Sequence, residues 1–391
     1  MRRRLSTLPG TVLALGAVSF FTDVSSEMIY PLLPVFLTGV LGAGPAALGA
    51  IEGAAESTAS VLKAVSGSWS DRVRRRKPLL VAGYGIAGVA RPLIGLAGSP
   101  LTVLGLRLAD RVGKGVRSSP RDALIADVTP ADRRGEAFGV QRALDHAGAV
   151  VGPLLAAALI GTAGLSLPTV FLLAAVPAAI VMLVLACAVR EQPRSVVVSD
   201  GAPLLTGWRE LGRPYWTVLG AVTLFTLGNS TDAFLLLRLA DAGVPVTGIA
   251  LLWSLFHVVK SGATFAGGRL SDRLGRRPMV IAGWAVYACV YLAFSVVSTR
   301  SAAIVAFLVY GLSFGLTEPV EKAWVADLAP ERLRGTAYGL YHAAVGIAAL
   351  PASLLFGAIW QLRGAPAAFV TGAVLAGMAA LWLLVSGRRG R

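Results

Sequence analysis

The chain carries one pattern of residues twice, and both copies lie between long apolar stretches. The segment 126–143 returns as 326–343, and the segment 67–77 returns as 268–277. The first pair shares, at equivalent positions, Ala126, Asp127, Pro130, Arg134, Gly135, Ala137, Gly139 and Ala143 with Ala326, Asp327, Pro330, Arg334, Gly335, Ala337, Gly339 and Ala343. A repeat with a fixed offset indicates that one structural unit is built twice. We therefore expect two halves with the same order of helices.

Apolar residues dominate the composition. Hydrophobic residues make up 55% of the 391 positions, charged residues 15%, and the mean hydropathy is +0.70. This is too little polar surface for a soluble protein, so we predict an integral protein of the lipid bilayer. The formal net charge of +15 could suggest a nucleic acid partner, but the Arg residues lie in short loops between apolar stretches. We therefore expect no nucleic acid partner.

Cysteine and terminal patterns narrow the class further. Cys187 and Cys289 lie inside apolar stretches without CxxC spacing or His partners, so we expect neither a disulfide nor a metal site. The opening Arg2–Arg4 and the apolar run after it resemble a signal peptide, but the run continues through Pro31 and Pro34 without a cleavage site. We interpret this run as the first membrane helix. We expect no cofactor and no enzymatic activity.

Twelve stretches are long and apolar enough to cross a bilayer, which takes about twenty residues per helix. They lie near 11–37, 46–69, 79–97, 101–126, 136–160, 168–189, 214–238, 246–268, 279–297, 301–326, 336–360 and 366–387. The segment 190–213 contains Pro193, Pro203 and a polar patch, and it is the expected cytoplasmic linker. It would join an N-terminal six-helix bundle (1–189) to a C-terminal one (214–391).

Arg and Lys residues predict the orientation in the membrane. They gather in the loops 70–78, 127–135, 190–213, 269–277 and 327–335, whereas the connections 38–46, 98–100 and 161–168 contain none. Loops rich in Arg and Lys stay in the cytoplasm. We therefore expect a multi-pass protein of the cytoplasmic membrane with both termini in the cytoplasm.

The loop Gly268–Arg277 closely resembles the signature that the major facilitator superfamily carries between the second and third helix of each half. The first copy differs at Arg74, where the signature has Gly. The resemblance implies an all-α fold with twelve transmembrane helices as two six-helix halves. It also implies a monomeric transporter of a small molecule that works by rocker-switch alternating access. A carboxylate at a helix end can face the N-terminus of another helix, so we predict a cytoplasmic gate of Asp71, Arg72, Asp272, Arg273, Asp127, Arg134, Asp327 and Arg334.

Two further motifs imply export by antiport. The segment Arg111–Gly115 resembles the Arg-x-x-Gln-Gly element of proton-coupled exporters in this superfamily, with Lys114 in place of Gln. The fifth span resembles the superfamily's antiporter signature, except that two Ala residues replace Gly; the residues are Gly139, Gly148, Gly152, Pro153, Ala156 and Ala157. Small residues let helices approach closely, and proline allows a bend. Such small-residue faces also occur in many membrane helices for packing alone.

Charged side chains inside the spans are the predicted functional groups, because they are costly in a bilayer. The fourth span places six of them at steps of three and four residues, and hence on one helix face: Arg107, Asp110, Arg111, Lys114, Arg117 and Arg121. Paired buried carboxylates can take up and release protons. We expect Glu27 to be the main proton carrier, followed by Asp23 and Glu56, with Glu52 and Asp145 in support. The alternative is a purely structural network of salt bridges.

The second half lacks most of these charges. The counterparts of Arg107, Asp110 and Arg111 are Phe307, Tyr310 and Gly311. We expect this half to offer the substrate a less charged surface, and the cavity candidates from both halves, besides the fourth span, are Arg142, His146, Asn229, His257 and Tyr341. Glu318, Glu321 and Lys322, with Asp232 and Lys260, are predicted as gate pairs or structural pairs. His257 alone fits a hydrogen-bonded core residue better than a ligand.

The sequence therefore favours a secondary transporter that exports a small solute by proton antiport. An anion transporter would instead use Arg107, Arg111, Lys114 and Arg117 to bind phosphate or carboxylate. A divalent-metal exporter would use Asp23 and Glu27 with His146 or His257. A membrane scaffold or sensor would need neither matched gating loops nor a charged interior.

Overall fold

The computed structural model describes residues 8–73, 75–130, 133–191, 208–330 and 333–386. The side chains of residues 64, 65, 67–72, 135 and 335 lie outside this part. Within the described ranges the chain is helical and forms no strand, which confirms the predicted all-helical class. Most of the expected linker, together with both terminal Arg clusters, lies outside the described residues.

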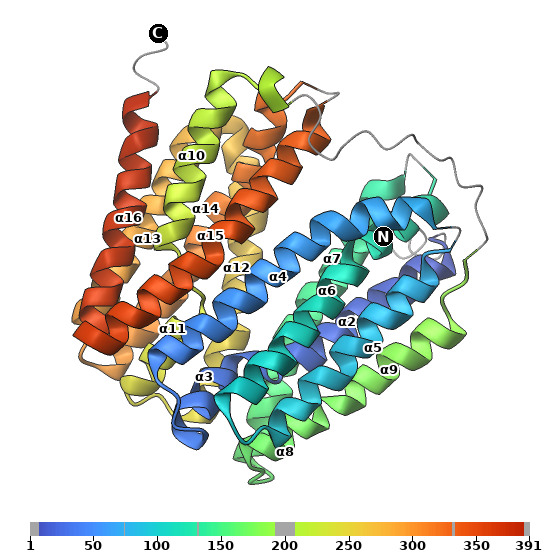
Figure 1. Cartoon of the computed structure of the whole chain (residues 1–391), viewed down its shortest axis with the longest axis horizontal. Coiled ribbons are helices and arrows are strands. Elements are labelled where there is room, and N and C mark those ends of the chain that lie inside the picture. The colour runs from blue at the N-terminus through green and yellow to red at the C-terminus, as the bar shows by residue number, and fades with distance from the viewer. Residues whose placement is uncertain (1–7, 74, 131–132, 192–207, 331–332, 387–391) are drawn as a thin grey trace. The chain divides into compact units, whose positions relative to one another are not determined.

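The helices follow one another as Figure 1 shows. The first half contains α2 (Gly10–Glu27), η1 (Tyr30–Leu32), α3 (Leu33–Val35), η2 (Phe36–Val40), α4 (Pro45–Arg72), α5 (Lys77–Leu93), η3 (Ile94–Leu96), α6 (Pro100–Val128), α7 (Arg134–Gly161), α8 (Leu167–Leu173) and α9 (Ala175–Cys187). The second half contains η5 (Trp208–Glu210), α10 (Arg213–Gly228), α11 (Ala233–Asp241), α12 (Val246–Leu274), α13 (Arg276–Val296), α14 (Arg300–Leu328), α15 (Arg334–Arg363) and α16 (Ala365–Ser386).

Ten of the described helices are long and apolar enough to cross a membrane. The other two long helices, α4 and α6, have 28 and 29 residues, and at 1.5 Å per residue each is about 40 Å long. They have the length to span a bilayer, but α6 carries the charged stripe and α4 carries Glu52 and Glu56. The predicted count of twelve spans therefore remains a prediction for these two helices.

Contacts divide the chain into two compact units. The first unit comprises Met1–Leu33 and Thr58–Gly201, and the second comprises Pro34–Ser57 and Ala202–Arg391. In the first unit α2 packs against α7 and α9, and α5 packs against α6 and α9 (Figure 1). In the second unit α14 packs against α12 and α13, and α16 packs against α10 and α13. The first half of α4 belongs to the second unit, where it lies against α15.

The duplication seen in the sequence recurs in the helices. α6 and α14 begin and end at residues that are 200 positions apart, and so do the starts of α7 and α15. Both copies use the same N-cap, because the hydroxyl of Ser99 accepts from the Thr102 N–H and that of Thr299 accepts from the Ala302 N–H. The repeated sequence therefore encodes repeated helix boundaries.

Helix crossings repeat as well. A Cβ atom on Gly115 of α6 would lie 2.5 Å from the Cβ of Leu62 on α4, and one on Gly315 of α14 would lie 2.5 Å from the Cβ of Ala263 on α12. Real Cβ atoms do not approach this closely, so only glycine fits at both crossings. The two units thus share the same close contact between equivalent helices.

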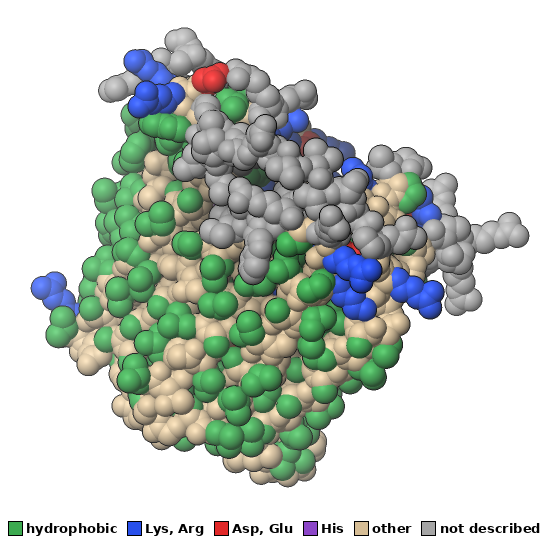
Figure 2. Space-filling model, turned by 45° about the vertical axis from the view of Figure 1, so that its right-hand side comes forward, with side chains coloured by type: hydrophobic (Ala, Val, Ile, Leu, Met, Phe, Trp, Pro, Cys, Tyr) green, Lys and Arg blue, Asp and Glu red, His purple; other side chains and the backbone are tan. Residues whose placement is uncertain are grey.

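Apolar side chains cover much of the surface. Figure 2 shows hydrophobic side chains spread over the face drawn, while Lys and Arg side chains form a few separate groups. Leu101, Val296 and Leu362 are each more than 70% exposed. Exposed apolar surface of this extent is typical of helices that face lipid.

Candidate functional site

A buried carboxylate on α6, Asp110, is the centre of a cluster of arginines in the first unit. Asp110 is 2% exposed, and its Oδ1 accepts from the Nε of Arg91 at 2.6 Å. Its Oδ2 lies 3.3 Å from the Nη1 of Arg107 and 3.8 Å from the Nε of Arg111. Arg91 also donates to the backbone carbonyl of Thr22 at 3.2 Å. The cluster therefore ties α2, α5 and α6 together.

Arg91 is a site residue that the sequence interpretation missed. It lies on α5 among apolar residues and is itself 4% exposed. A single Arg inside an otherwise apolar span is costly in a membrane and points to a buried partner. That signal was present in the sequence, but the identity of the partner depends on how α5 packs against α6.

A single stripe would suggest that the six charged side chains of α6 are equally buried, but they are not. Arg107, Asp110 and Arg117 are buried, whereas Lys114 is exposed. The guanidinium of Arg117 lies 4.3 Å from the ring centroid of Tyr84 on α5. Its Nη1 has no hydrogen-bond partner among the described residues. This face of α6 therefore combines Arg107, which pairs with Asp110, and Arg117, which has one nitrogen without a hydrogen-bond partner among the described residues.

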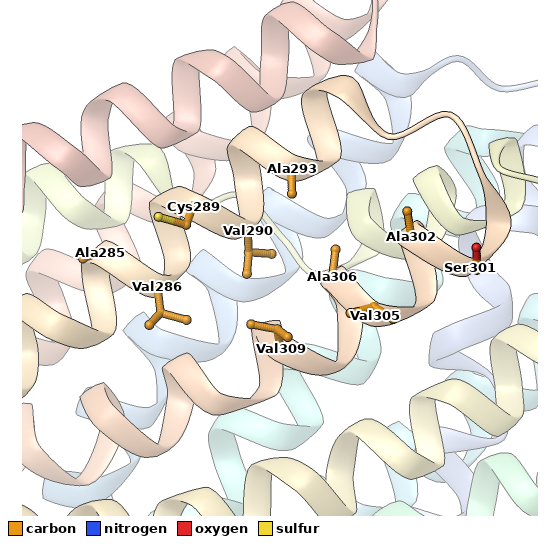
Figure 3. Close-up of a pocket in the computed structure, with 10 residues that line it drawn as sticks. All are labelled: Ala285, Val286, Cys289, Val290, Ala293, Ser301, Ala302, Val305, Ala306 and Val309. Atoms are coloured by element: carbon orange, nitrogen blue, oxygen red, sulfur yellow. The ribbon is translucent and has the colours of Figure 1, made fainter.

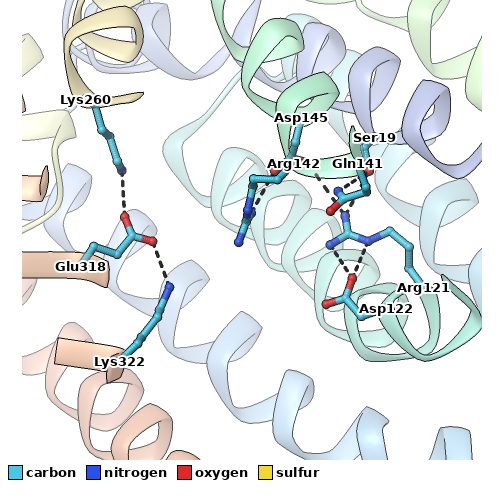
Figure 4. A network of polar contacts seen from close by, with 9 residues as sticks. All are labelled: Ser19, Arg121, Asp122, Gln141, Arg142, Asp145, Lys260, Glu318 and Lys322. Carbon is cyan, nitrogen blue, oxygen red and sulfur yellow. Dashed lines mark hydrogen bonds and ion pairs between the residues drawn. The ribbon is translucent and has the colours of Figure 1, made fainter. Parts of the chain in front are cut away.

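A second polar network joins α2, α6 and α7 in the same unit (Figure 4). Asp145 lies 3.1 Å from the Nη1 of Arg142 and 4.0 Å from the Nη1 of Arg121. The side chain of Arg121 also pairs with Asp122 at 2.9 Å. The hydroxyl of Ser19 on α2 accepts from Arg121 at 3.3 Å and from Gln141 at 2.9 Å. Asp145 and Arg142 were sequence candidates, whereas Ser19 and Gln141 were not.

The two predicted proton carriers on α2 lie directly against the glycines of the antiporter-like motif on α7. A Cβ on Gly148 would lie 3.1 Å from the Cβ of Asp23, and one on Gly152 would lie 3.1 Å from the Cβ of Glu27. Gly139, the first glycine of the motif, has nothing within 4 Å of such a Cβ. Gly148 and Gly152 therefore let α7 approach α2 at the two carboxylates. Gly139 takes no part in this close approach.

Asp23 and Glu27 are partly buried and lie among charges of both signs. The charged groups that act on Asp23 are Asp145, Glu27, Lys114 and Arg117. The hydroxyl of Ser26 donates to Glu27 Oε1 at 3.4 Å. The structure thus brings Asp23, Glu27 and Asp145 together with the cations of α6. His146, the next candidate on α7, is also partly buried.

Glu52 and Glu56 lie on the part of α4 that belongs to the second unit. Glu52 is 4% exposed, and Glu56 is exposed. One residue further along, the hydroxyl of Ser57 donates to the backbone carbonyl of Gly346 on α15 at 2.6 Å. That Glu52 and Glu56 bind protons as a pair on one face of α4 remains a prediction.

The helix ends beside the Arg-rich loops carry a repeated ion pair. Arg76 pairs with Asp127 in the first unit, and Arg276 pairs with Asp327 in the second, where the Nε–Oδ2 distance is 3.1 Å. Arg276 also lies 2.6 Å from Asp272. The sequence predicted the three carboxylates but not their partners Arg76 and Arg276. Of the other predicted gate residues, Arg134, Arg273 and Arg334 are exposed, and the side chains of Asp71 and Arg72 lie outside the described part.

The two repeated ion pairs differ in burial, and this predicts a difference in stability. Arg76 is 3% exposed, whereas the Arg276 side chain is 25% exposed. We expect Asp127→Asn to lower the free energy of unfolding by about 1–3 kcal/mol, because a buried guanidinium loses its carboxylate. Asp327→Asn should cost only about 0–1 kcal/mol. Denaturant titration of the purified variants measures both values, and equal losses would contradict the prediction.

Aromatic side chains in the second unit take the place of the arginine cluster. Arg91 and Asp110 correspond by the 200-residue offset to Tyr291 and Tyr310. The hydroxyl of Tyr310 donates to Asp232 at 2.6 Å, and Tyr291 shares a hydrogen bond of 3.1 Å with Ser230. Both partners lie in the break between α10 and α11. The cavity candidates Asn229 and His257 are partly buried, in this break and on α12 respectively.

The second unit nevertheless contains a deeply buried carboxylate on α14, which the sequence analysis named only as a member of a gate pair or a structural pair. Glu321 on α14 is 7% exposed and accepts hydrogen bonds from Trp284 on α13 and Tyr341 on α15. Tyr341 was a sequence candidate for the cavity. Its structural partner is a carboxylate, which gives the aromatic surface of this unit an acidic group.

An apolar cavity lies between α13 and α14 (Figure 3). Its volume is about 750 Å³, and ten residues line it: Ala285, Val286, Cys289, Val290, Ala293, Ser301, Ala302, Val305, Ala306 and Val309. These side chains are small and uncharged, so they supply no group for proton transfer. Among the described residues, no group of three His, Cys, Asp or Glu side chains could hold a metal ion.

The sequence of the chain is similar to those of known proteins. The model of the Major Facilitator Superfamily matches residues 15–259 and 233–391. An uncharacterized MFS-type transporter of Methanocaldococcus jannaschii is 33% identical over 383 residues, which cover 96% of this chain and 95% of that one. The class E tetracycline resistance protein of Escherichia coli is 26% identical over 366 residues, or 89% and 88% of the two chains.

A solved structure gives the same picture of the fold. A bacterial homolog of the human lysosomal transporter Spinster, in an inward-facing and occupied conformation, superposes with a TM-score of 0.77. The match covers 96% of each chain at 17% identity. A likeness at this identity shows the arrangement of the helices alone.

Proposed function

The chain belongs to the Major Facilitator Superfamily and is a multi-pass membrane transporter, and we propose that it exports a small solute across the cytoplasmic membrane in exchange for protons. The observation that carries the proposal is the contact between Asp23 and Glu27 on α2 and the motif glycines Gly148 and Gly152 on α7. This contact places the predicted proton carriers directly against the predicted antiport motif. The likeness to a tetracycline resistance protein supports export.

Protonation would act through the charges that surround Asp23. When Asp23 is ionised, Lys114 and Arg117 attract it; when it is protonated, that attraction is lost while the cations remain. A proton can therefore bias one conformation against another, provided that the two differ in these contacts. We propose that rocking of the two six-helix halves, 1–189 and 214–391, uses this bias. The repeated ion pairs of the Arg-rich loops would then close the cytoplasmic side.

The orientation and assembly follow from the same proposal. Both termini would lie in the cytoplasm, because loops rich in Arg and Lys stay on that side of the membrane. All twelve long helices would cross the bilayer, including α4 and α6, several of whose charged side chains are buried. One chain would form the complete transporter.

We expect Asp23→Asn and Glu27→Gln to abolish proton flux driven by a substrate gradient in proteoliposomes, because neither side chain can then bind and release a proton. Glu136→Gln is the matched control, since Glu136 lies in the first turn of α7 and pairs with Arg133 at 2.8 Å. It should retain the flux of the unmodified protein. Unchanged flux in both α2 variants would rule out these carboxylates as carriers.

A second candidate, transport of an anionic solute, is favoured by one observation on α6. The Nη1 of buried Arg117 has no hydrogen-bond partner among the described residues, so a carboxylate or phosphate could bind there. In that case Arg117→Gln would abolish substrate binding itself. For a proton-coupled exporter of uncharged or cationic solutes, the same change would alter coupling and leave binding in place.

A further inference from the structure

Glu321 is a carboxylate enclosed by three helices of the second unit. Its Oε1 accepts from the indole Nε1 of Trp284 on α13 at 3.0 Å, and its Oε2 accepts from the hydroxyl of Tyr341 on α15 at 2.8 Å. Trp284 is itself held by Phe225 of α10, whose ring lies parallel at 4.7 Å. Glu321 is 7% exposed. A carboxylate is costly to bury in its charged form unless its partners compensate the charge.

The nearby cations are directed to a different carboxylate. Lys322 lies 3.0 Å from Glu318 on the same helix, and Lys260 of α12 lies 3.7 Å from the other oxygen of Glu318 (Figure 4). Two titratable groups of α15 also face this region: Tyr338, whose hydroxyl donates to the Lys322 carbonyl at 2.9 Å, and His342, whose ring lies edge-on 5.2 Å from the ring of Tyr341. Among the described residues, the groups that bond Glu321 are therefore neutral donors.

The repeat places a group of opposite charge at the equivalent position of the first unit. Glu321 corresponds to Arg121, and Tyr341 corresponds to Gln141. Arg121 keeps its charge at any physiological pH, and two carboxylates lie within 4.0 Å of it. A carboxyl group can gain and lose a proton. Only the second unit thus has a group at this position whose charge can change.

We propose that Glu321 is a proton-binding site of the second unit, distinct from the carboxylates of α2, and this rests on the proposed coupling of transport to protons. The partners fix which oxygen takes the proton. The indole N–H of Trp284 can only donate, so Oε1 stays an acceptor. The hydroxyl of Tyr341 can donate or accept. The proton therefore adds to Oε2, and the new O–H donates to the oxygen of Tyr341.

The hydrogen bond from Trp284 provides a direct measurement. Indole emission depends on the charge of the group that the N–H contacts, so Trp284 should report the state of Glu321. We expect the tryptophan emission of the purified full-length protein, without substrate, to include a pH-dependent step that comes from Trp284. The step should be absent in Trp284→Phe and in Glu321→Gln. It should persist in Glu318→Gln, the matched control on the same helix.

Each variant must be folded before its emission can be compared. Size-exclusion chromatography shows whether each variant is folded. If Glu321→Gln does not fold, Tyr341→Phe replaces it, because this change keeps the carboxyl group and removes the donor at Oε2. The step should then shift its midpoint. A step that persists in Glu321→Gln, an unshifted midpoint in Tyr341→Phe, or no step in the unmodified protein would each overturn the proposal.

The experiment separates this proposal from the proposed function. It measures proton binding at equilibrium without transport, whereas the variants of Asp23 and Glu27 are tested by flux. A pH step at Glu321 together with normal flux in both α2 variants would remove the α2 carriers and leave this site. Loss of flux in those variants without any step at Glu321 would do the reverse.

Discussion

Asp110→Asn is expected to lower the free energy of unfolding by about 3–5 kcal/mol, the loss seen when one partner of a buried charge network is removed. The change leaves the guanidinium groups of Arg91 and Arg107 buried without a carboxylate between them. It also weakens the link from α5 to the Thr22 carbonyl on α2, since Arg91 would no longer be held in place. Denaturant titration of the purified protein measures the loss.

Asp122→Asn is the matched control for this prediction. Asp122 lies on the same helix and pairs with Arg121 at 2.9 Å, but its side chain is 44% exposed. Exposed ion pairs contribute about 0–1 kcal/mol, so this variant should be close to the unmodified protein. If both variants lower the free energy of unfolding by similar amounts, the burial of Asp110 does not explain the contribution of its cluster to stability.

Gly148→Val is expected to abolish transport and to destabilise the protein by about 1–3 kcal/mol or more, as overpacking does in a close helix contact. A side chain at this position would collide with the backbone carbonyl of Phe20 on α2 and press on the Cβ of Asp23. α7 would have to move away from α2 at the proposed proton carriers. Gly152→Val should act in the same way, because a Cβ there would lie 2.7 Å from the Val24 carbonyl oxygen.

Gly139→Val tests whether Gly148→Val loses transport and stability through its contact with α2 or through the helix propensity of Val. Both positions lie within α7, so the substitution has the same intrinsic effect on the helix. A Cβ on Gly139 has nothing within 4 Å, and the variant should keep both stability and transport. If Gly148→Val transports its substrate at the rate of Gly139→Val, the close α2–α7 contact has no part in the mechanism.

The sequence was sufficient to predict most of the helices, because membrane spans are encoded by local apolar runs and by the repeat. The matched starts of α6 and α14 follow directly from residues that are 200 positions apart. The sequence also predicted that Asp23 and Glu27 matter, since carboxylates are rare inside apolar stretches. Their contact with the antiporter-like glycines was not predicted, because the helix face that each glycine occupies depends on packing between α2 and α7.

The partners of the buried charges could not be predicted from the sequence for the same reason. Arg91 binds Asp110 across two helices, and Trp284 binds Glu321 across two others. No local pattern relates residues that are 19 or 37 positions apart and lie on different helices. The interruption between α10 and α11 was also missed, although Asn229 and Ser230 are poor helix formers, because the apolar run continues on both sides.

The charge content of α6 has a consequence for biogenesis. A charged residue at the centre of a helix adds about 2.5–3.5 kcal/mol to the free energy of insertion from the translocon, and α6 carries many, including Arg107, Asp110, Arg111 and Arg117. α6 is thus too polar to enter the bilayer alone. Arg91 on α5 is synthesised before it, but Asp145 on α7 is synthesised after it. We therefore expect α6 to remain beside the translocon until α7 emerges, so that the three helices enter the lipid as one group.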